Sequence, residues 1–331
     1  MDLSTTYLGL SLSNPFVAGP SPFTRRLDTI KRLEEAGISA IVLPPLFEEQ
    51  LLSDEMAIFD SIDTPAESFP EALSYFTEPE RAIVEAEAYM EHLAEVKKNT
   101  NVPVIGAINA VTAARWKGYA MGMEQAGADA LELDFYYVAN DVSESGRRIE
   151  RRFVEALKRV KRNVSIPVAV KLTPFHTSLA HFAAKLQAEG ADGFTLLHRF
   201  YEADLDIENL EPLSRPHFSD SRDLLLRLRW LAIISGNLTT SLAASGGVHS
   251  VEDVVKAIMT GAHCIQLGSV LQKNGIGHVA TLRDGLAAWL EKHEYESVRQ
   301  MRGTMNFKHI PDPKALSRAH YMHLLSSWGS E

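Results

Sequence analysis

Short apolar runs alternate with longer amphipathic stretches along most of the chain. Eight runs have the length of buried strands, and each is followed by a segment with helical spacing. The predicted strands are 15–18, 40–43, 102–108, 130–133, 167–171, 193–197, 239–243 and 263–267. The predicted helices are 26–36, 80–98, 113–126, 147–162, 179–189, 224–234 and 251–259, followed by a helical, polar remainder from 279. This alternation predicts an α/β protein, a (β/α)8 TIM barrel in a single domain over 1–331 with a C-terminal helical extension.

Four glycines occupy the same place in this strand–helix repeat, between the end of a helix and the start of the next strand. Gly37, Gly127, Gly190 and Gly261 each end a predicted helix and are followed by Ile or Ala and then a strand. Because glycine is the usual residue just past a helix C-terminus, the four positions support regular helix–strand joints. No linker divides the chain into two domains.

Segments outside the repeat are predicted to cover the two ends of the barrel. Residues 5–14 predict a β-hairpin around Gly9 that plugs the bottom. Three long connections, 47–79, 140–146 and 202–221, are predicted as top-face loops. Loops of such length inside a compact domain are usually functional.

Composition and charge exclude several classes of protein. The net charge is −10, and the basic residues of the 147–162 helix are interleaved with Glu150 and Glu155, which predicts a solvated helix face and no nucleic-acid partner. The single cysteine, Cys264, excludes an intrachain disulfide and a cysteine metal cluster, and its apolar strand predicts burial. The chain shows no signal peptide and no membrane-spanning stretch. We therefore expect a cytoplasmic protein without a metal.

Two glycine turns near the end of the repeat indicate a phosphate site. Ser245-Gly246-Gly247 follows the seventh predicted strand and Gly268-Ser269 follows the eighth. Unscreened backbone N–H groups at a helix start attract a phosphate, and barrels often bind one at this position. The alternative is two ordinary strand–helix turns that use glycine for its conformational freedom.

Polar residues at other strand ends form the predicted pocket, because barrel chemistry lies at the carboxyl ends of the strands. Lys171 closes an apolar strand, and its ammonium group is suited to a Schiff base, a phosphate or a negatively charged cofactor ring, or to pairing with Asp134. His198 is suited to acid–base chemistry, hydrogen bonding or a place on the rim. Asn109 ends the third strand.

Four segments together resemble the dihydroorotate dehydrogenase family of FMN-dependent barrels, over residues 8 to about 271. They are Leu8-Gly9-Leu10 with Asn14-Pro15-Phe16-Val17-Ala18, then 127–133, then Val168-Ala169-Val170-Lys171-Leu172-Thr173-Pro174-Phe175, and the two glycine turns. The resemblance implies an FMN-dependent oxidoreductase of pyrimidine metabolism that acts on a CH–CH bond of dihydroorotate or a related small molecule. It also implies a homodimer.

The resemblance further implies positions for the cofactor. Gly246, Gly247, Gly268 and Ser269 hold the FMN phosphate through backbone N–H groups, and Lys171 lies by the pyrimidine edge of the isoalloxazine. There it stabilises the negative charge of the reduced flavin. Ala18 and Gly19 pass close to the ring, and Asn109 and Ser245 complete the predicted FMN contacts.

The chain departs from the family at the substrate end. Asp134-Phe135-Tyr136-Tyr137-Val138-Ala139-Asn140 stands where the family has an Asn, a catalytic Cys or Ser, a Pro and an Asn. Pro44 replaces a family lysine, and His198 stands where the family has an asparagine. Tyr137 is nearest the missing Cys, so the predicted catalytic residues are Tyr137, Lys171 and His198, with Tyr136 and Ser143 as alternates.

Three functions remain open at this point. The first is an FMN-dependent dehydrogenase whose substrate has changed. The second is a phosphate-binding aldolase or decarboxylase in which Lys171 forms a Schiff base. The third is a barrel that binds FMN without turnover, as a subunit of a larger redox complex with an electron-transfer partner.

Overall fold

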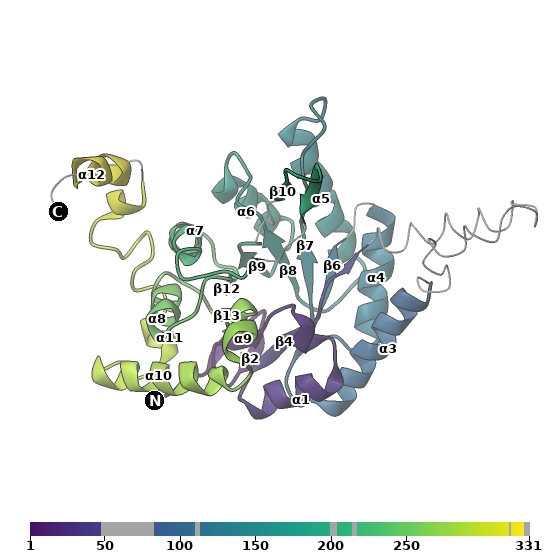
Figure 1. The fold of residues 1–331 in the computed structure, drawn as a ribbon, viewed down its shortest axis with the longest axis horizontal. Helices are drawn as coiled ribbons and strands as arrows, with labels where there is room; N and C mark the ends of the chain where they lie inside the picture. Colours follow the sequence, from purple (N-terminus) through teal and green to yellow (C-terminus); the bar gives the residue numbers. More distant parts are fainter. Residues whose placement is uncertain (48–82, 110–112, 199–203, 214–216, 318, 328–331) are drawn as a thin grey trace, which may run out of the picture.

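A closed barrel of eight parallel strands, with helices between the strands, forms the body of the molecule in the computed structural model (Figure 1). The structure describes residues 1–331 apart from 48–82, 110–112, 199–203, 214–216, 318 and 328–331. The barrel strands are β3 (Phe16–Ala18), β4 (Ala40–Val42), β6 (Val104–Asn109), β7 (Ala130–Asp134), β8 (Val168–Leu172), β9 (Gly193–Leu196), β12 (Ser241–Ser245) and β13 (Cys264–Leu267). Pairing of β13 with β3 and of β4 with β6 closes the ring, so the predicted barrel is confirmed.

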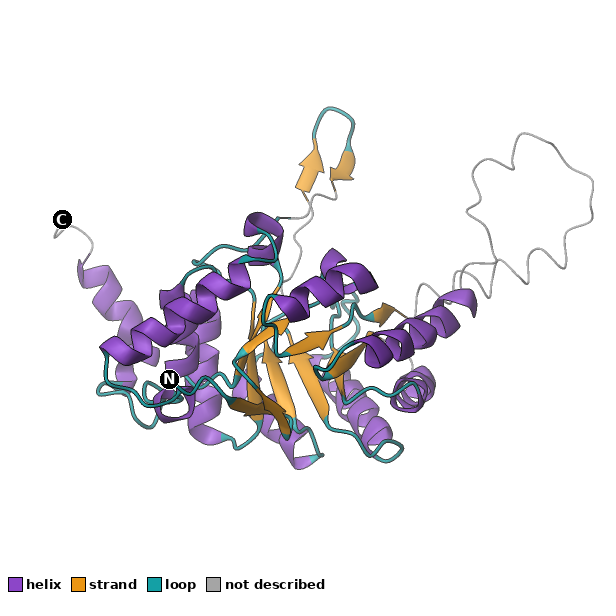
Figure 2. Ribbon diagram, turned by 90° about the horizontal axis from the view of Figure 1, so that it is seen from below, coloured by secondary structure: helices purple, strands orange, loops and turns teal. Residues whose placement is uncertain are grey.

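Helices follow the strands and surround them (Figures 1 and 2). They are α1 (Leu27–Glu35), α3 (Ile83–Asn99), α4 (Ala113–Gln125), α5 (Gly146–Lys161), α6 (Leu179–Ala188), α7 (Leu224–Asn237), α8 (Val251–Met259), α9 (Ser269–Asn274) and α10 (His278–Lys292). In α5, Phe153, Leu157 and Val160 are buried against the barrel while Arg147 and Arg148 are exposed. The basic residues therefore lie on a solvated face of an amphipathic helix, as predicted.

The four glycines that end helices have positive φ angles, as expected for a glycine just past a helix C-terminus. Their φ angles are +99° at Gly37, +96° at Gly127, +100° at Gly190 and +121° at Gly261, a region that residues with a side chain rarely adopt. At the last joint the N–H of Ala262 donates to the Ala257 carbonyl at 3.0 Å, which closes the end of the helix. Each joint turns the chain directly into the next strand.

The N-terminal hairpin plugs one end of the barrel, as predicted. Strands β1 (Thr5–Tyr7) and β2 (Leu10–Leu12) are antiparallel, and the side chains of Tyr7, Leu8 and Leu12 are buried among small residues inside the barrel. Those small residues are Ala40, Ala107, Ala130, Ala169, Ala243 and Cys264. Burial, followed in size by the charge of Glu132, raises the pKa of the Cys264 thiol well above its usual range. The cysteine is therefore an unreactive core residue.

Other segments differ from the prediction or extend it. A short strand, β5 (Leu46–Phe47), pairs with β6 beside the barrel. The connection predicted as a loop over 202–221 contains an antiparallel hairpin, β10 (Asp204–Asp206) and β11 (Glu211–Leu213), which projects away from the barrel (Figure 2). Most of its apolar side chains are exposed, among them Leu205, Ile207 and Leu210, so the sequence showed no buried face that would indicate these strands. The predicted loop over 47–79 lies outside the described residues, apart from Phe47.

Two further helices, α11 (Val298–Met301) and α12 (Ala319–Ser327), follow α10 in the C-terminal part, and α12 lies away from the barrel (Figure 1). No helix in the described ranges is both long enough and apolar enough to cross a membrane.

His263 makes the fold sensitive to acid. Its Nδ1 accepts the Leu242 backbone N–H at 3.1 Å, and burial, assisted by the charge of Arg302, lowers its pKa from 6.5 to about 4. Below pH 6.5 the His263 imidazole binds a proton in the unfolded chain but stays neutral in the folded chain until the pH approaches 4. We therefore expect stability to fall as the pH is lowered from 6.5 to 4, with His263 contributing about 3 kcal/mol over that range.

Chemical denaturation of the wild type and His263→Asn at pH 7 and pH 4.5 checks this. Asparagine offers an acceptor oxygen near the Nδ1 position but does not titrate, so the variant should lose less stability at pH 4.5. His217→Asn, at an exposed histidine, is the matched control. Equal losses in the wild type and His263→Asn would contradict the assignment.

Candidate active site

A cavity of about 530 Å3 opens at the carboxyl ends of the barrel strands. Most of the predicted site residues line it together: Gly19, Lys171, His198, Ser245, Gly246, Gly268 and Ser269. Ala18 and Gly247 are the chain neighbours of Gly19 and Gly246, and Ala18 is fully buried. Asn109 is buried at the end of β6, where it pairs with Phe47 of β5. The structure therefore gathers residues from both ends of the chain at the place that barrel enzymes use.

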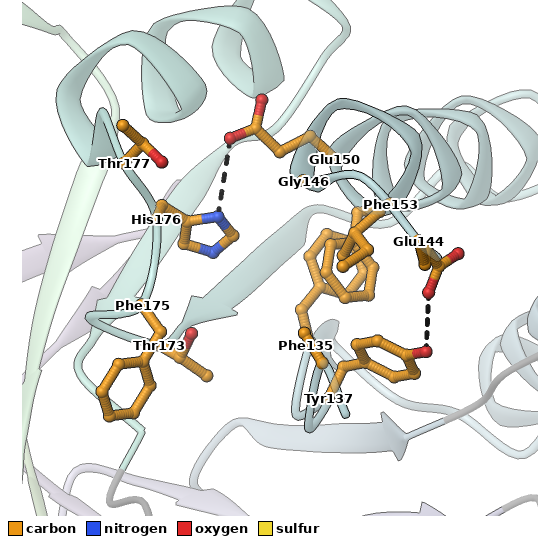
Figure 3. Close-up of a pocket in the computed structure, with 12 residues that line it drawn as sticks. Phe135, Tyr137, Glu144, Gly146, Glu150, Phe153, Thr173, Phe175, His176 and Thr177 are labelled. Carbon is orange, nitrogen blue, oxygen red and sulfur yellow. Dashed lines mark hydrogen bonds and ion pairs between the residues drawn. The ribbon is translucent and has the colours of Figure 1, made fainter. Parts of the chain in front are cut away.

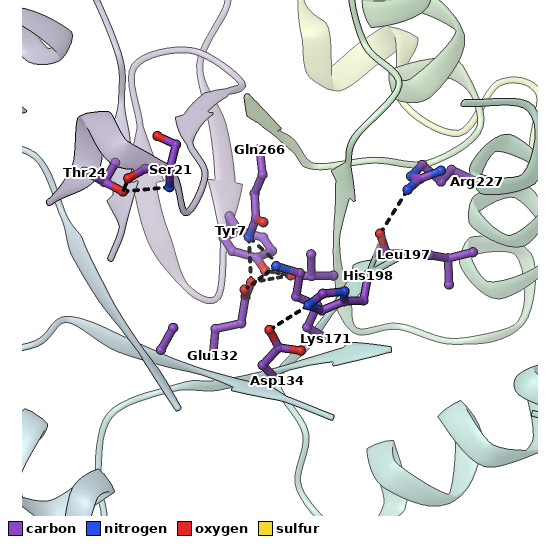
Figure 4. Close-up of polar contacts among 12 residues, drawn as sticks. Tyr7, Ser21, Thr24, Glu132, Asp134, Lys171, Leu197, His198, Arg227 and Gln266 are labelled. Atoms are coloured by element: carbon purple, nitrogen blue, oxygen red, sulfur yellow. Dashed lines mark hydrogen bonds and ion pairs between the residues drawn. The ribbon is translucent and has the colours of Figure 1, made fainter. Parts of the chain in front are cut away.

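A buried polar network stands beneath the cavity (Figure 4). Glu132, in the middle of β7, is 1% exposed, and its Oε2 accepts hydrogen bonds at 2.6 Å from Thr195 Oγ1 and from Gln266 Nε2. Lys171 Nζ lies 3.5 Å from Glu132 Oε1, and its side chain is 8% exposed. The buried carboxylate thus fixes the lysine and favours its positively charged form.

Asp134 and His198 form a second polar contact at the cavity. Asp134 is the last residue of β7, and its Oδ2 lies 3.0 Å from Nε2 of His198, which follows β9. The Asp134 side chain is 2% exposed and the His198 side chain 15%. The ring of Tyr136 lies beside the imidazole, with 4.7 Å between the centroids. The pair joins strands that are separated in the barrel by β8.

The two glycine turns are held together by Ser219. Its hydroxyl accepts the Gly247 N–H at 3.1 Å, and its own N–H donates to Ser269 Oγ at 3.2 Å. Lys273 Nζ donates to the Ser219 carbonyl at 2.8 Å. Ser219 therefore joins the two turns, and it brings hydroxyl groups and the Lys273 ammonium group beside them. Hydroxyl and ammonium groups are kinds of group that bind a phosphate.

Tyr137 lies apart from Lys171 and His198. Its hydroxyl donates to Glu144 Oε2 at 2.8 Å, and the Arg152 guanidinium stands 4.5 Å above its ring. Tyr137 lines a different cavity, of about 350 Å3, together with Phe135 and Phe153 (Figure 3). Asp134 lines the barrel cavity while Phe135 and Tyr137 line this outer one, which is the alternation that an extended chain imposes.

Sequence reasoning missed Glu132, Gln266 and Ser219 as parts of the site. The first two carried a signal, because each is a polar residue inside an otherwise apolar strand and must find a partner when buried. Ser219 carried none, since it stands in a polar connection far from the turns in sequence. Asp134 was identified at a strand end, but its pairing with His198 was not predicted.

The cavity fits a flat, polar ligand such as a flavin. Four side-chain atoms of its lining are buried without a hydrogen-bond partner among the described residues: Ser21 Oγ, Asp134 Oδ1, Gln266 Oε1 and Gln272 Nε2. Such orphaned groups are costly unless a ligand satisfies them. A Cβ on Gly19 would lie 3.3 Å from Gln266 Cβ, so the glycine keeps this wall close to the backbone. Within the described ranges, no cluster of His, Cys, Asp and Glu is arranged to hold a metal ion.

Fold and site together define a (β/α)8 barrel enzyme with a phosphate-type turn at its last two strands and a cationic, partly buried pocket. The model of the dihydroorotate dehydrogenase family matches residues 84–290. The chain belongs to this family and is an oxidoreductase of the dehydrogenase type that acts on a CH–CH bond. Members of the family depend on a flavin.

Curated relatives resemble the chain over most of its length. The catalytic subunit of dihydroorotate dehydrogenase B (NAD(+)) from Thermoplasma volcanium is 24% identical, over 91% of this chain and 98% of the relative. The NAD-dependent dihydropyrimidine dehydrogenase subunit PreA from Escherichia coli is 22% identical, over 94% of this chain and 78% of the relative. The relatives thus span both the described barrel and the segments around it.

Proposed function

We propose that the chain is an FMN-dependent dehydrogenase that oxidises a CH–CH bond of dihydroorotate or a related small molecule. The observation that carries the proposal is the cavity itself. It combines a buried lysine, two glycine turns and four orphaned polar atoms at the carboxyl ends of the strands. The relatives named for dihydroorotate and dihydropyrimidine support the class of substrate.

The predicted cofactor-binding residues each have a role in this proposal. Gly246, Gly247, Gly268 and Ser269 hold the phosphate, while Ala18, Gly19, Asn109 and Ser245 form the walls near the ring. When bound, FMN accepts a hydride from the substrate. Lys171, fixed by Glu132, presents a positive charge where negative charge develops.

Two predicted residues, His198 and Tyr137, are candidates for the group that takes a proton from the substrate. His198 faces the same cavity as Lys171, whereas Tyr137 would first have to leave Glu144 and its outer cavity. The role of Tyr137 therefore stays a prediction, and the geometry favours His198 and its partner. The whole chain 1–331 as a single FMN-binding domain also stays a prediction.

An absorption spectrum of the purified protein tests the proposal first. We expect the visible flavin bands, release of FMN on denaturation, and bleaching during anaerobic titration with dihydroorotate, dihydrouracil or dihydrothymine. A colourless protein that does not take up added FMN would contradict the cofactor. A yellow protein whose flavin is reduced neither by these compounds nor by NAD(P)H, and is not reoxidised by an enoate, would instead favour the non-catalytic FMN-binding subunit.

The Schiff-base alternative is disfavoured by one contact. A lysine that attacks a carbonyl needs its neutral amine, whereas Glu132 at 3.5 Å favours the ammonium form of Lys171. Failure of borohydride to trap a carbonyl substrate on Lys171 would agree with this assignment.

We also propose that the chain forms a homodimer and works with an electron-transfer partner protein. The Thermoplasma relative is named as a catalytic subunit, which supports an electron-transfer partner for this chain. The homodimer and the cytoplasmic location stay predictions, and light scattering after size-exclusion chromatography measures the first.

A further inference from the structure

One buried carboxylate oxygen at the cavity has no assigned role. Asp134 Oδ2 is held by His198, but Oδ1 is buried without a hydrogen-bond partner among the described residues. A buried carboxylate oxygen left alone costs free energy that a ligand donor can restore. The orphaned atom therefore points to a hydrogen of the bound molecule.

The surroundings of Asp134 suit proton transfer. It is paired in register with Lys171 on the adjacent strand, and His198 approaches from the segment after β9. Two residues earlier in β7 stands Glu132, whose charge is balanced by Lys171. A carboxylate oxygen can accept a proton from a ligand, which an amide cannot.

Three polar residues of the loop after β7, Tyr137, Asp141 and Ser143, do not line the barrel cavity. Tyr137 lines the outer cavity with its hydroxyl on Glu144. Asp141 and Ser143 are bonded to each other, through Ser143 Oγ and Asp141 Oδ1 at 2.7 Å, in an exposed part of the loop. The carboxylate that lines the barrel cavity, Asp134, comes from the end of β7 itself.

We propose that Asp134 is the catalytic base and that His198 is its positioning residue, an inference that rests on the proposed function. Asp134 Oδ1 takes the proton from one substrate carbon, and the electron pair of that C–H bond becomes the new C=C bond. The neighbouring carbon gives up its hydrogen as a hydride to the flavin, which is the oxidant and is reduced by two electrons. His198 Nε2 holds Oδ2 throughout and so fixes the orientation of the carboxylate.

Asp134→Asn tests the base directly. The amide keeps the size of the side chain but cannot take the proton, so we expect anaerobic flavin reduction by dihydroorotate to slow about 100-fold. Flavin content should stay at the wild-type ratio. NMR of the substrate in D2O gives a second readout, because exchange of the carbon-bound hydrogen should be lost in parallel. Asp141→Asn, at an exposed carboxylate of the following loop, is the matched control and should match the wild type.

Substitutions of His198 test the positioning role. His198→Ala should slow reduction about tenfold, and His198→Asn, which offers an amide donor to Oδ2, should recover part of the loss. The pH dependence of the reduction rate should differ between the wild type and His198→Ala. A pH profile that stays unchanged in His198→Ala while the rate drops would show that His198 has a structural role only.

The outcomes separate this inference from the proposed function. If the wild type is reduced by none of the dihydropyrimidines, the proposed substrate class fails and the inference fails with it. If the wild type is reduced and Asp134→Asn is reduced equally fast, only the inference is overturned. If Tyr137→Phe alone abolished flavin reduction, the catalytic base would be Tyr137 in the loop after β7 and not Asp134.

Discussion

Lys171→Met should lower the midpoint potential of the bound flavin by about 60 mV and slow its reduction about 100-fold. The proposed position of Lys171 places a positive charge beside the ring when the ring gains electrons. Loss of one such electrostatic contact costs about 2.7 kcal/mol, and for a two-electron couple about 30 mV corresponds to 1.4 kcal/mol. A dye-coupled reductive titration measures the potential, and stopped-flow absorbance measures the rate.

The same substitution should also destabilise the fold. Without Lys171, Glu132 would be a 1% exposed carboxylate that lacks its cation, and breaking such a buried pair costs about 3–5 kcal/mol. The double variant Lys171→Met/Glu132→Gln removes the unpaired charge and should recover most of the stability. Its flavin should still be reduced slowly, because the positive charge at the ring remains absent.

Lys161→Met is the matched control for Lys171→Met. Lys161 Nζ forms an ion pair with Asp192 at 2.7 Å, but both side chains are partly exposed and lie outside the cavity. Its loss should cost no more than about 1 kcal/mol and leave the potential unchanged. A potential that shifts equally in both variants would remove Lys171 from the site.

The fold was predictable because barrel strands are buried on both faces. The runs 130–133 and 263–267 are apolar except for Glu132 in the first and His263 and Gln266 in the second, and glycine marks the joints before them. The hairpin of β10 and β11 escaped prediction for the opposite reason. Leu205 and Leu210 are exposed and Pro212 interrupts the second strand, so neither burial nor regular alternation indicated it.

The site was predictable only where chain position determines geometry. Strand ends meet at one face of a barrel, which brought Lys171, His198 and the glycine turns together correctly. The choice of Tyr137 came from its place in a loop, and position in a loop does not say which way a side chain points. The structure places it with Phe135 in the outer cavity, while Asp134 lines the barrel cavity.

Contacts between distant segments could not be predicted from spacing. Ser219 bridges Gly247 and Ser269, and Arg227, buried in α7, donates to the carbonyls of Ser245 and Leu197. These bonds depend on how α7 and the connection before it lie across the barrel. The turns alone predicted a phosphate site but not the side chains that support it.

Gly247→Ala should cost about 3 kcal/mol or more of stability and abolish the preference for FMN over riboflavin. The residue has φ +84°, and an added Cβ would lie 2.4 Å from the Leu224 backbone nitrogen and 2.8 Å from its Cα. The loss of stability has two causes: backbone strain at the positive φ, and overpacking of the added Cβ against the start of α7. Each is worth about 1–3 kcal/mol. The displaced turn would also lose the hydrogen bond from the Gly247 N–H to Ser219, which holds the two turns of the proposed phosphate site together.

Two other glycines separate these effects. Gly275 has φ +80° but open space around an added Cβ, so Gly275→Ala should show the strain alone. Gly118 lies in α4 with open space and ordinary helical geometry, so Gly118→Ala should stabilise the protein by up to about 1 kcal/mol. Urea denaturation ranks the three variants, and fluorescence quenching of FMN and riboflavin compares their binding. If Gly247→Ala were no less stable than Gly275→Ala, the close approach of α7 would be wrong. If Gly247→Ala still bound FMN more tightly than riboflavin, the phosphate would lie elsewhere.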